Sequence, residues 1–242
     1  MTAAPPRLIA FDTSTERMAV ALQGPGGAVV LDEPGGAAAS ATLLPQVMRL
    51  LASAGLAPGD LEYVAFGRGP GAFTGLRTAC AVAQGLAFGI GRPVLAIDSL
   101  LIVAEDARAQ AGATAAFDIG IAMDARMDEI YAAAYRFNGT AWGTLAEPAL
   151  LALPALAEAW RGLQLHAVAG SAWTAFGERL PPPVPRVFAR EQGRAAALLH
   201  LALKAAAAGE GVDAAQALPL YLRDKVALTI REREAARAAT LA

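Results

Sequence analysis

The chain has 242 residues, of which 55% are hydrophobic and 17% are charged, and its formal net charge is −2. This composition is typical of a globular protein with one large or two small cores, and it excludes a disordered polypeptide. It also argues against a protein that holds nucleic acid by itself, because such proteins carry a basic field that neutralises phosphate.

Several features indicate a soluble protein of the cytoplasm. Cys80 is the only cysteine, so no intrachain disulfide can form and a reducing compartment is expected. The first residues lack the basic-then-apolar pattern of a signal peptide. The longest strongly apolar run, Ala79 to Ile90, is too short to span a bilayer and contains Gln84, so no membrane segment is expected.

The first third of the chain predicts a mixed sheet. Short apolar runs separated by turn residues predict three antiparallel strands, at residues 8–11, 18–22 and 28–31. Helical and strand patterns then alternate, with helices at 43–54, at 74–88 and from Leu100 onward, and strands at 63–66 and 94–97. Asp98-Ser99 provides a cap for the third helix. This order implies an α/β fold with helices on the faces of the sheet.

The later part of the chain begins the pattern again. Strands are predicted at 117–123 and 129–137, followed by Asn138-Gly139, the preferred two-residue hairpin turn. Helices near 153–160 and 194–208 alternate with apolar runs at 165–169 and 184–188, and LPPPVP at 180–185 predicts a rigid surface loop. We expect a first lobe of residues 1–105, a second lobe of residues 106–216, and a C-terminal segment, 217–242, that returns to the first lobe.

The densest motif is a Gly-rich strand-to-helix turn that begins at Gly67. Its spacing permits two interpretations: an anion or phosphate cradle, or a tight turn whose glycines serve close packing. It is not a Walker A loop, because no Gly-Lys-Ser/Thr follows. Thr74 is predicted to cap the next helix. The candidate phosphate-loop residues here are Gly69, Gly71, Thr74, Gly75 and Arg77.

The two helices beside this loop carry apolar and small residues at helical spacing. The periodicity alone favours stripes that face their own sheet. If part of these stripes is exposed, they form a helix-on-helix docking surface instead. The candidate residues are Leu43, Leu44, Val47, Leu50, Leu51, Gly75, Ala79, Val82, Ala83 and Leu86.

Acidic and hydroxyl residues follow two of the predicted strands. Asp12, Thr13 and Ser14 could hold a metal-bound phosphate, or could form only the turns that such residues favour in a hairpin. The acids of Asp124–Glu129 could coordinate Mg²⁺, although a charged surface turn is the simpler interpretation. Pro219–Arg223 is an apolar patch that a packed tail explains as well as a ligand does.

No catalytic group stands out in the sequence. His166 and His200 are the only histidines and are far apart, so a histidine-rich metal site is excluded in a monomer. His200 lies among leucines and alanines in a helical pattern, which favours a structural role over a catalytic triad. Cys80 lies in an apolar helical segment, which predicts a buried and unreactive thiol.

Taken together, these segments resemble the TsaB (YeaZ) family over nearly the whole chain. The resemblance rests on six motifs in the expected order, of which GRGPGAFTGLR is the most specific. They are LIAFDTST at 8–15, LLPQV at 43–47, GRGPGAFTGLR at 67–77, AQGLA at 83–87, DARMDEIY at 124–131 and PLYLR at 219–223.

The resemblance implies an actin-like fold, related to acetate and sugar kinases, with two lobes of mixed sheets flanked by helices. It implies a non-catalytic subunit in the biosynthesis of tRNA N6-threonylcarbamoyladenosine. Its partners would be the paralogous transferase TsaD and the ATPase TsaE, with tRNA reached only through the complex. ATP and Mg²⁺ would be used by those subunits, with no metal or tightly bound cofactor in this chain. Members of the family can also self-associate through the same helical face, so a homodimer is a possible form of the isolated protein.

Carried over by position, the two helices would form the docking surface, and Asp12–Ser14 with Gly69–Gly75 would be remnants of phosphate motifs. The chain departs from many relatives in lacking a His before the LLP motif and in having Asp128 where they have Gly. Both departures weaken a ligand-binding role at those positions. The alternative hypothesis is an enzyme of the same fold, either an ATP-dependent phosphotransferase or a metalloprotease-like hydrolase, with nucleotide and Mg²⁺ bound at Asp12 and the Gly-rich loop.

Overall fold

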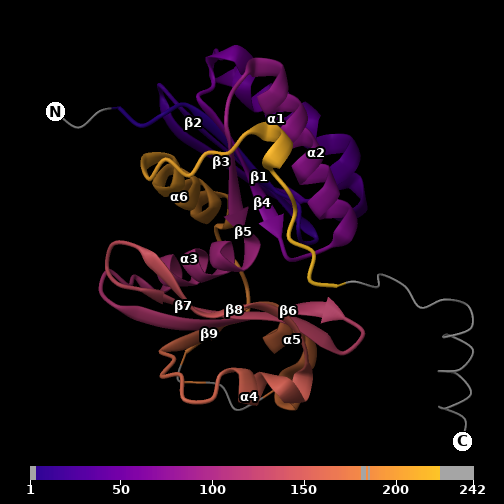
Figure 1. Ribbon diagram of the computed structural model, residues 1–242, viewed down its shortest axis with the longest axis vertical. Coiled ribbons are helices and arrows are strands. Elements are labelled where there is room, and N and C mark those ends of the chain that lie inside the picture. The colour runs from indigo at the N-terminus through magenta and orange to yellow at the C-terminus, as the bar shows by residue number, and fades with distance from the viewer. Residues whose placement is uncertain (1–3, 181–183, 185, 224–242) are drawn as a thin grey trace, which may run out of the picture.

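The computed structural model describes residues 4–180, 184 and 186–223 and contains two five-stranded sheets, stacked with helices around and between them (Figure 1). The strand orders are β3-β2-β1-β4-β5 and β10-β9-β6-β7-β8. In both sheets a three-stranded antiparallel meander is followed by two strands that run parallel to its first strand. The two lobes therefore share one topology.

The first sheet is formed by the early part of the chain. Its strands are β1 (Leu8–Asp12), β2 (Arg17–Gly24), β3 (Gly27–Pro34), β4 (Tyr63–Gly69) and β5 (Val94–Asp98). Side chains alternate between its faces, so that Ile9 and Phe11 enter one hydrophobic cluster and Leu8 and Ala10 enter another. The near-continuous apolar runs seen in the sequence are thus explained by a sheet that is covered on both sides.

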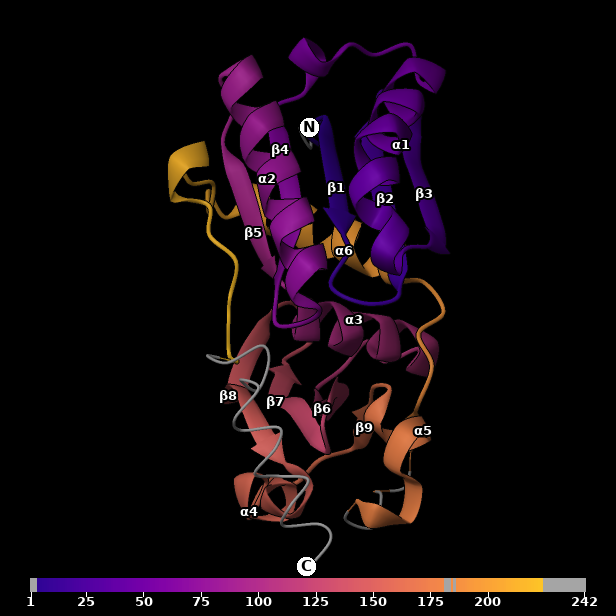
Figure 2. The ribbon, with the colours of Figure 1, turned by 90° about the vertical axis from the view of Figure 1, so that its right-hand side faces the viewer.

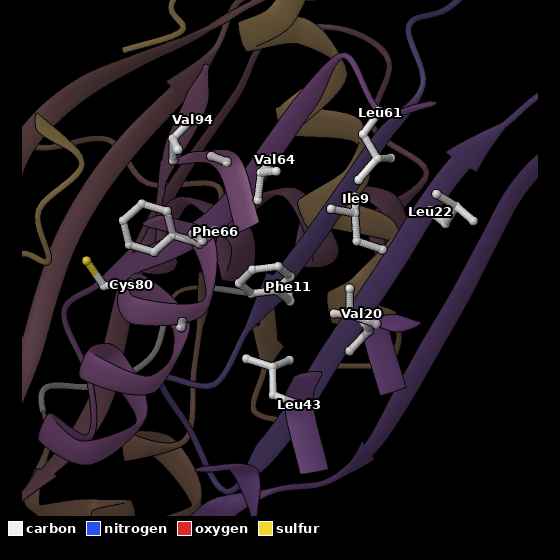
Figure 3. Packing of buried hydrophobic residues seen from close by; sticks show 14 of the residues in the cluster. Ile9, Phe11, Val20, Leu22, Leu43, Leu61, Val64, Phe66, Cys80 and Val94 are labelled. Atoms are coloured by element: carbon white, nitrogen blue, oxygen red, sulfur yellow. The ribbon is translucent and has the colours of Figure 1, made fainter. Parts of the chain in front are cut away.

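Helices α1 (Ala39–Ser53) and α2 (Phe73–Ile90) cover one face of this sheet, and they lie side by side (Figure 2). Leu43 and Cys80 pack from these helices against Phe11, Phe66 and other strand residues (Figure 3). Cys80 is buried, as predicted, and burial raises the pKa of its thiol.

Helices α3 (Ser99–Ala111) and α6 (Arg194–Ala207) lie on the opposite face. The predicted cap of α3 is confirmed, because the Asp98 carboxylate accepts a hydrogen bond from the Leu100 amide at 2.8 Å. The residues of α6 fall in the range 106–216 that we predicted for the second lobe, yet α6 packs on β1 and β2. We therefore propose that the return to the first lobe begins at Arg194 and not at Ala217.

The second sheet is smaller in its parallel half. Its strands are β6 (Phe117–Arg126), β7 (Glu129–Phe137), β8 (Trp142–Ala152), β9 (Ala167–Ala169) and β10 (Val187–Phe188). Helix α3 packs on one face, and the short helices α4 (Leu156–Ala159) and α5 (Ala172–Phe176) pack on the other. Helix α3 therefore forms a layer shared by the two lobes.

Some local predictions for the second lobe need correction. The hairpin turn lies at the predicted place, but the Asn138 amide donates to the Ala141 carbonyl at 3.0 Å, so its central residues are Gly139-Thr140. The helix predicted near 153–160 is a 3₁₀ turn, Leu153–Ala155, followed by one turn of α-helix. Much of the predicted 180–185 loop, and residues 224–242 of the predicted returning segment, lie outside the described residues. The predicted arrangement, two lobes of mixed sheets flanked by helices, is confirmed.

Candidate functional site in the cleft between the lobes

A cleft of about 460 Å³ lies between the two lobes. Its walls come from the turn after β1, the start of α2, the start of α3, the β6–β7 turn, the start of α6 and the C-terminal residues 220–223. Several sequence motifs that are far apart along the chain therefore meet here.

Asp12 lies behind the first-lobe wall of the cleft: it is fully buried and contacts Ser14, Ser99 and Arg194, which line the cleft. One carboxylate oxygen, Oδ2, accepts a hydrogen bond from the Ser99 hydroxyl at 2.7 Å. The other, Oδ1, accepts from the Ser14 hydroxyl at 2.7 Å and from the Ser14 amide at 2.9 Å. Both oxygens are thus engaged by the first lobe before any cation is considered.

Arg194 supplies that cation from the first turn of α6. Its guanidinium lies 3.1 Å from Asp12 Oδ1, donates to the Ser14 hydroxyl at 2.9 Å, and donates to a carboxylate oxygen of Glu191 at 2.5 Å. The Arg194 side chain is only 2% exposed. A buried charge of this kind is tolerated only when it is paired and hydrogen-bonded, and here it is both.

The electrostatics of this cluster keep Asp12 charged. Burial alone would raise the pKa of Asp12, but the Arg194 guanidinium and the hydrogen bonds from Ser99 and Ser14 hold it below its usual value. Burial would lower the pKa of Arg194, whereas Asp12 and Glu191 hold it above its usual value. Burial also raises the pKa of Glu191, against the opposing effect of Arg194. Asp12 and Arg194 thus form a closed internal ion pair.

The Gly-rich loop packs directly on this cluster. A Cβ atom at Gly67 would lie 1.6 Å from Asp12 Oδ2, and one at Gly75 would lie 1.8 Å from the carbonyl oxygen of Thr13. The Thr13 hydroxyl in turn donates to the carbonyl of Gly75 at 2.7 Å. Of the two interpretations of the loop, these contacts support close packing, because the glycines make room for the backbone and side chains of the turn after β1.

Other residues of the predicted phosphate loop are placed differently from the prediction. Gly69 has φ of +107° and donates its amide to the Ser99 hydroxyl, and a Cβ atom at Gly71 would lie 2.4 Å from the carbonyl oxygen of Ser14. The cap position of α2 is Ala72, so the predicted cap at Thr74 is wrong. Arg77 Nε donates to the Tyr221 hydroxyl of the C-terminal segment at 3.3 Å, and its guanidinium stacks on Phe73 of α2, with 4.0 Å between Cζ and the ring centroid.

The predicted docking stripe is mostly core. Seven of its residues are buried in the first lobe because the α1 and α2 stripes face their own sheet: Leu43, Val47, Leu50, Leu51, Gly75, Ala79 and Ala83. The expectation that these seven contact a partner is therefore corrected. Leu44 is 47% exposed, Val82 and Leu86 are half-buried, and Met48, which the sequence did not single out, is 42% exposed.

The acids of the β6–β7 turn are each engaged within the protein. Asp124 accepts from the Arg126 amide at 2.7 Å, Asp128 pairs with Arg179 at 3.0 Å, and Glu129 pairs with Arg223 at 2.6 Å. Within the described residues, no group of three or more His, Cys, Asp or Glu side chains is placed to hold a metal ion. The geometry supports the interpretation of this segment as a charged surface turn.

Sequence reasoning missed the residues that close the site, namely Arg194, Ser99 and Glu191. Arg194 is separated from Asp12 by 182 positions, and no local motif joins them. The available signal was weak: one arginine at the start of an otherwise apolar helical stretch.

Across the described part of the chain, none of the helices combines the length and apolarity that crossing a membrane requires.

Comparison with known proteins places these features in a family. Residues 33–239 match the family model described as "TsaD: tRNA N6-adenosine threonylcarbamoyltransferase". A curated protein of Escherichia coli strain K12, named tRNA threonylcarbamoyladenosine biosynthesis protein TsaB, is 32% identical over 236 residues, which cover 91% of this chain and 96% of that protein. The protein of the same name from Haemophilus influenzae is 40% identical over 124 residues, or 51% of each chain.

Solved structures agree with the sequence comparison. The structure described as YeaZ from Pseudomonas aeruginosa is 42% identical and superposes with a TM-score of 0.79, covering 90% of this chain and 100% of that one. A second structure from the same organism, described as an uncharacterized protein with similarity to peptidase YEAZ, has a TM-score of 0.81 at 41% identity, with the same coverage.

Proposed function

The chain belongs to the TsaB (YeaZ) family, and from this premise we propose that it is a non-catalytic subunit that binds and activates the paralogous transferase TsaD. The named relatives support a role in tRNA threonylcarbamoyladenosine biosynthesis. The ATPase TsaE is the third member of the proposed assembly, which works in the cytoplasm. Because the net charge is −2, tRNA is reached through the assembly and not by this chain alone.

The observation that carries the non-catalytic part of the proposal is the closed pair of Asp12 and Arg194. A carboxylate that binds Mg²⁺ offers its oxygen atoms as ligands, and an internal cation paired with those oxygens competes for them. Asp12 instead accepts from Ser14, Ser99 and Arg194, inside the first lobe. We therefore assign no tightly bound cofactor to this chain, and ATP and Mg²⁺ to the partner subunits.

The surface that fits a partner is the outer side of α1 and α2. We call Leu44, Met48, Val82, Gly85 and Leu86 the docking ridge. Leu44 and Met48 are nearly half exposed, and a Cβ placed at Gly85 would point into open space beside its own helix. An apolar helical ridge with a small residue at its centre lets another helix approach closely. The same ridge would support self-association when the partner is absent.

Binding of the purified paralogue tests the docking ridge. Met48→Asp is expected to weaken the complex at least about 100-fold, because interface centres concentrate the binding energy and reject an unpaired charge. Val187→Asp is the matched control, since Val187 is 41% exposed but lies on the second lobe. Calorimetry measures both affinities, and thermal unfolding checks that both variants fold. Wild-type affinity in folded Met48→Asp would show that the ridge is the wrong surface.

The alternative function is an ATP-dependent phosphotransferase or a metalloprotease-like hydrolase. The specific observation in its favour is the cleft of about 460 Å³, which is large enough for a small ligand. Calorimetry of the isolated chain with ATP and Mg²⁺ distinguishes the two functions. We expect no sub-micromolar binding and no turnover, and the opposite result would favour the enzyme.

A further inference from the structure

The C-terminal residues Ala217–Arg223 cross from the first lobe to the second along the cleft. At the first-lobe end, the carbonyl of Ala217 accepts a hydrogen bond from Gln84 Nε2 at 2.9 Å. The Leu220 amide donates to the carbonyl of Arg68 at 2.7 Å. The Tyr221 ring lies 5.3 Å from the Phe73 ring between centroids. This end is thus attached to β4 and α2 by backbone and aromatic contacts.

At the second-lobe end, Leu222 packs on the hydrophobic cluster of the second sheet, and Arg223 makes the polar contacts. Arg223 pairs with Glu129 at 2.6 Å and donates a second hydrogen bond to the carbonyl of Ala125 at 2.9 Å. The Arg223 side chain is 16% exposed and that of Glu129 is 32% exposed. Partly buried, charge-assisted hydrogen bonds of this kind are stronger than surface pairs. Arg223 therefore attaches the segment firmly to the β6–β7 turn.

The other ion pair across this side of the cleft is weaker. Glu16, in the turn before β2, lies 3.3 Å from Arg126, but the two side chains are 78% and 72% exposed. Pairs this exposed contribute little in water. On the inner side, α3 packs against both sheets, so it is the natural axis for a relative movement of the lobes.

We propose that Ala217–Arg223 is a clasp: its Arg223 end holds the two lobes closed over the cleft, and release of that end opens the cleft by rotation about α3. The clasp is an internal device of this chain and does not depend on the proposed role in tRNA modification. Residues 220–223 line the cleft, so a ligand that enters it meets the clasp directly.

Hydrogen exchange of the full chain, without any partner, tests the clasp. Arg223→Met keeps the apolar stem but removes both charge-assisted bonds, and we expect amides in 218–222 and 124–131 to exchange about tenfold faster, as the loss of one such interaction predicts. Amides of β1, β4 and α2 should exchange at the wild-type rate. Small-angle scattering should show a larger radius of gyration.

The matched control is Arg179→Met, which removes an arginine that pairs with Asp128 of the same turn but joins only second-lobe residues. We expect wild-type exchange in 218–222 and an unchanged radius of gyration. Glu129→Gln, which keeps the shape and a hydrogen bond, should give an intermediate increase. The clasp is refuted if Arg223→Met leaves 218–222 unchanged, or if exchange accelerates equally throughout the chain, since the second result would mean global destabilisation.

Discussion

The turn after β1 and the turn after β6 occupy equivalent places in the two lobes, because each joins the first two strands of a sheet with the same topology. Asp12, Thr13 and Ser14 in the first turn are buried. Arg126, Met127 and Asp128 in the second are exposed, and all three have positive φ values of 66°, 57° and 57°. One position in the fold has thus become core in one lobe and surface in the other.

The difference comes from what packs on each turn. The first is covered by the Gly-rich loop and by Arg194, which α6 brings back from the C-terminal part of the chain. The turn after β6 has no such cover among the described residues: the close glycine contact in that lobe, Gly170 against the carbonyl of Ala122 at 2.2 Å for a Cβ atom, is made to β6 itself. The turn is contacted by the side chains of Arg179 and Arg223. Whether a turn in this fold is buried or exposed therefore depends less on its own residues than on the helix and loop that pack over it.

Removing Arg194 should cause the largest loss of stability among the substitutions that compare the two turns. Arg194→Met leaves Asp12 buried without its cation, and we expect a loss of about 3–5 kcal/mol in the free energy of unfolding. Arg126→Met removes the ion pairs of a side chain that is 72% exposed and should cost less than about 1 kcal/mol. Urea denaturation of both variants measures the two values. Equal losses would mean that the Asp12–Arg194 pair is not specially important to the first lobe.

Adding a methyl group to the Gly-rich loop should have the next largest effect. Gly75→Ala places a Cβ atom against the Thr13 carbonyl, and we expect a loss of about 1–3 kcal/mol or more. Gly85→Ala is the control on the same helix, because its Cβ meets open space, and it should stabilise the protein by about 0.5–1 kcal/mol. Thermal unfolding compares the two; a harmless Gly75→Ala would contradict the close packing of loop and turn.

Lowering the pH should destabilise the protein through Asp12, which lies in the turn after β1. Its pKa is lowered on folding from an ordinary value of 3.8, so its contribution to stability is complete above that value and is lost as the pH falls through the lower folded pKa. Burial raises the pKa of Glu191, which opposes this dependence. In Arg194→Met the pKa of Asp12 should rise instead, because burial then acts without the guanidinium.

Urea denaturation between pH 5 and pH 3 measures this effect. The stability of Arg194→Met should fall less than that of the wild type over this range, or rise. A parallel loss of stability in both proteins would show that Asp12 does not titrate as the buried pair requires.

The smallest expected effect comes from relieving backbone strain in the turn after β6. Met127→Gly removes a side chain from a left-handed backbone conformation, and we expect a gain of up to about 1 kcal/mol. Replacing the glycine at Gly75 is thus predicted to destabilise the protein, whereas introducing a glycine at Met127 is predicted to stabilise it. Chemical denaturation checks the sign, and a destabilised Met127→Gly would mean that the Met127 side chain makes a contact worth more than the strain.

Much of the fold was predictable from local sequence patterns. The strands of the first sheet, the two helices beside it, the cap at Asp98 and the position of the 138–141 turn all follow from periodicity and turn residues. The short elements of the second lobe were less predictable, because β9, β10 and α4 are held by tertiary packing and are too short to show a period.

The sequence by itself determined which segments are strands and helices, that Asp12–Ser14 and the Gly-rich loop follow strands, and that α1 and α2 each carry an apolar stripe. Only the tertiary structure decided what covers them. Periodicity defines a stripe but not its partner, so it could not show that Leu43 and Val47 face the sheet while Leu44 and Met48 face outward. Nor could it join Asp12 to Arg194, because an ion pair between distant residues arises from the return of α6 to the first sheet and leaves no local pattern.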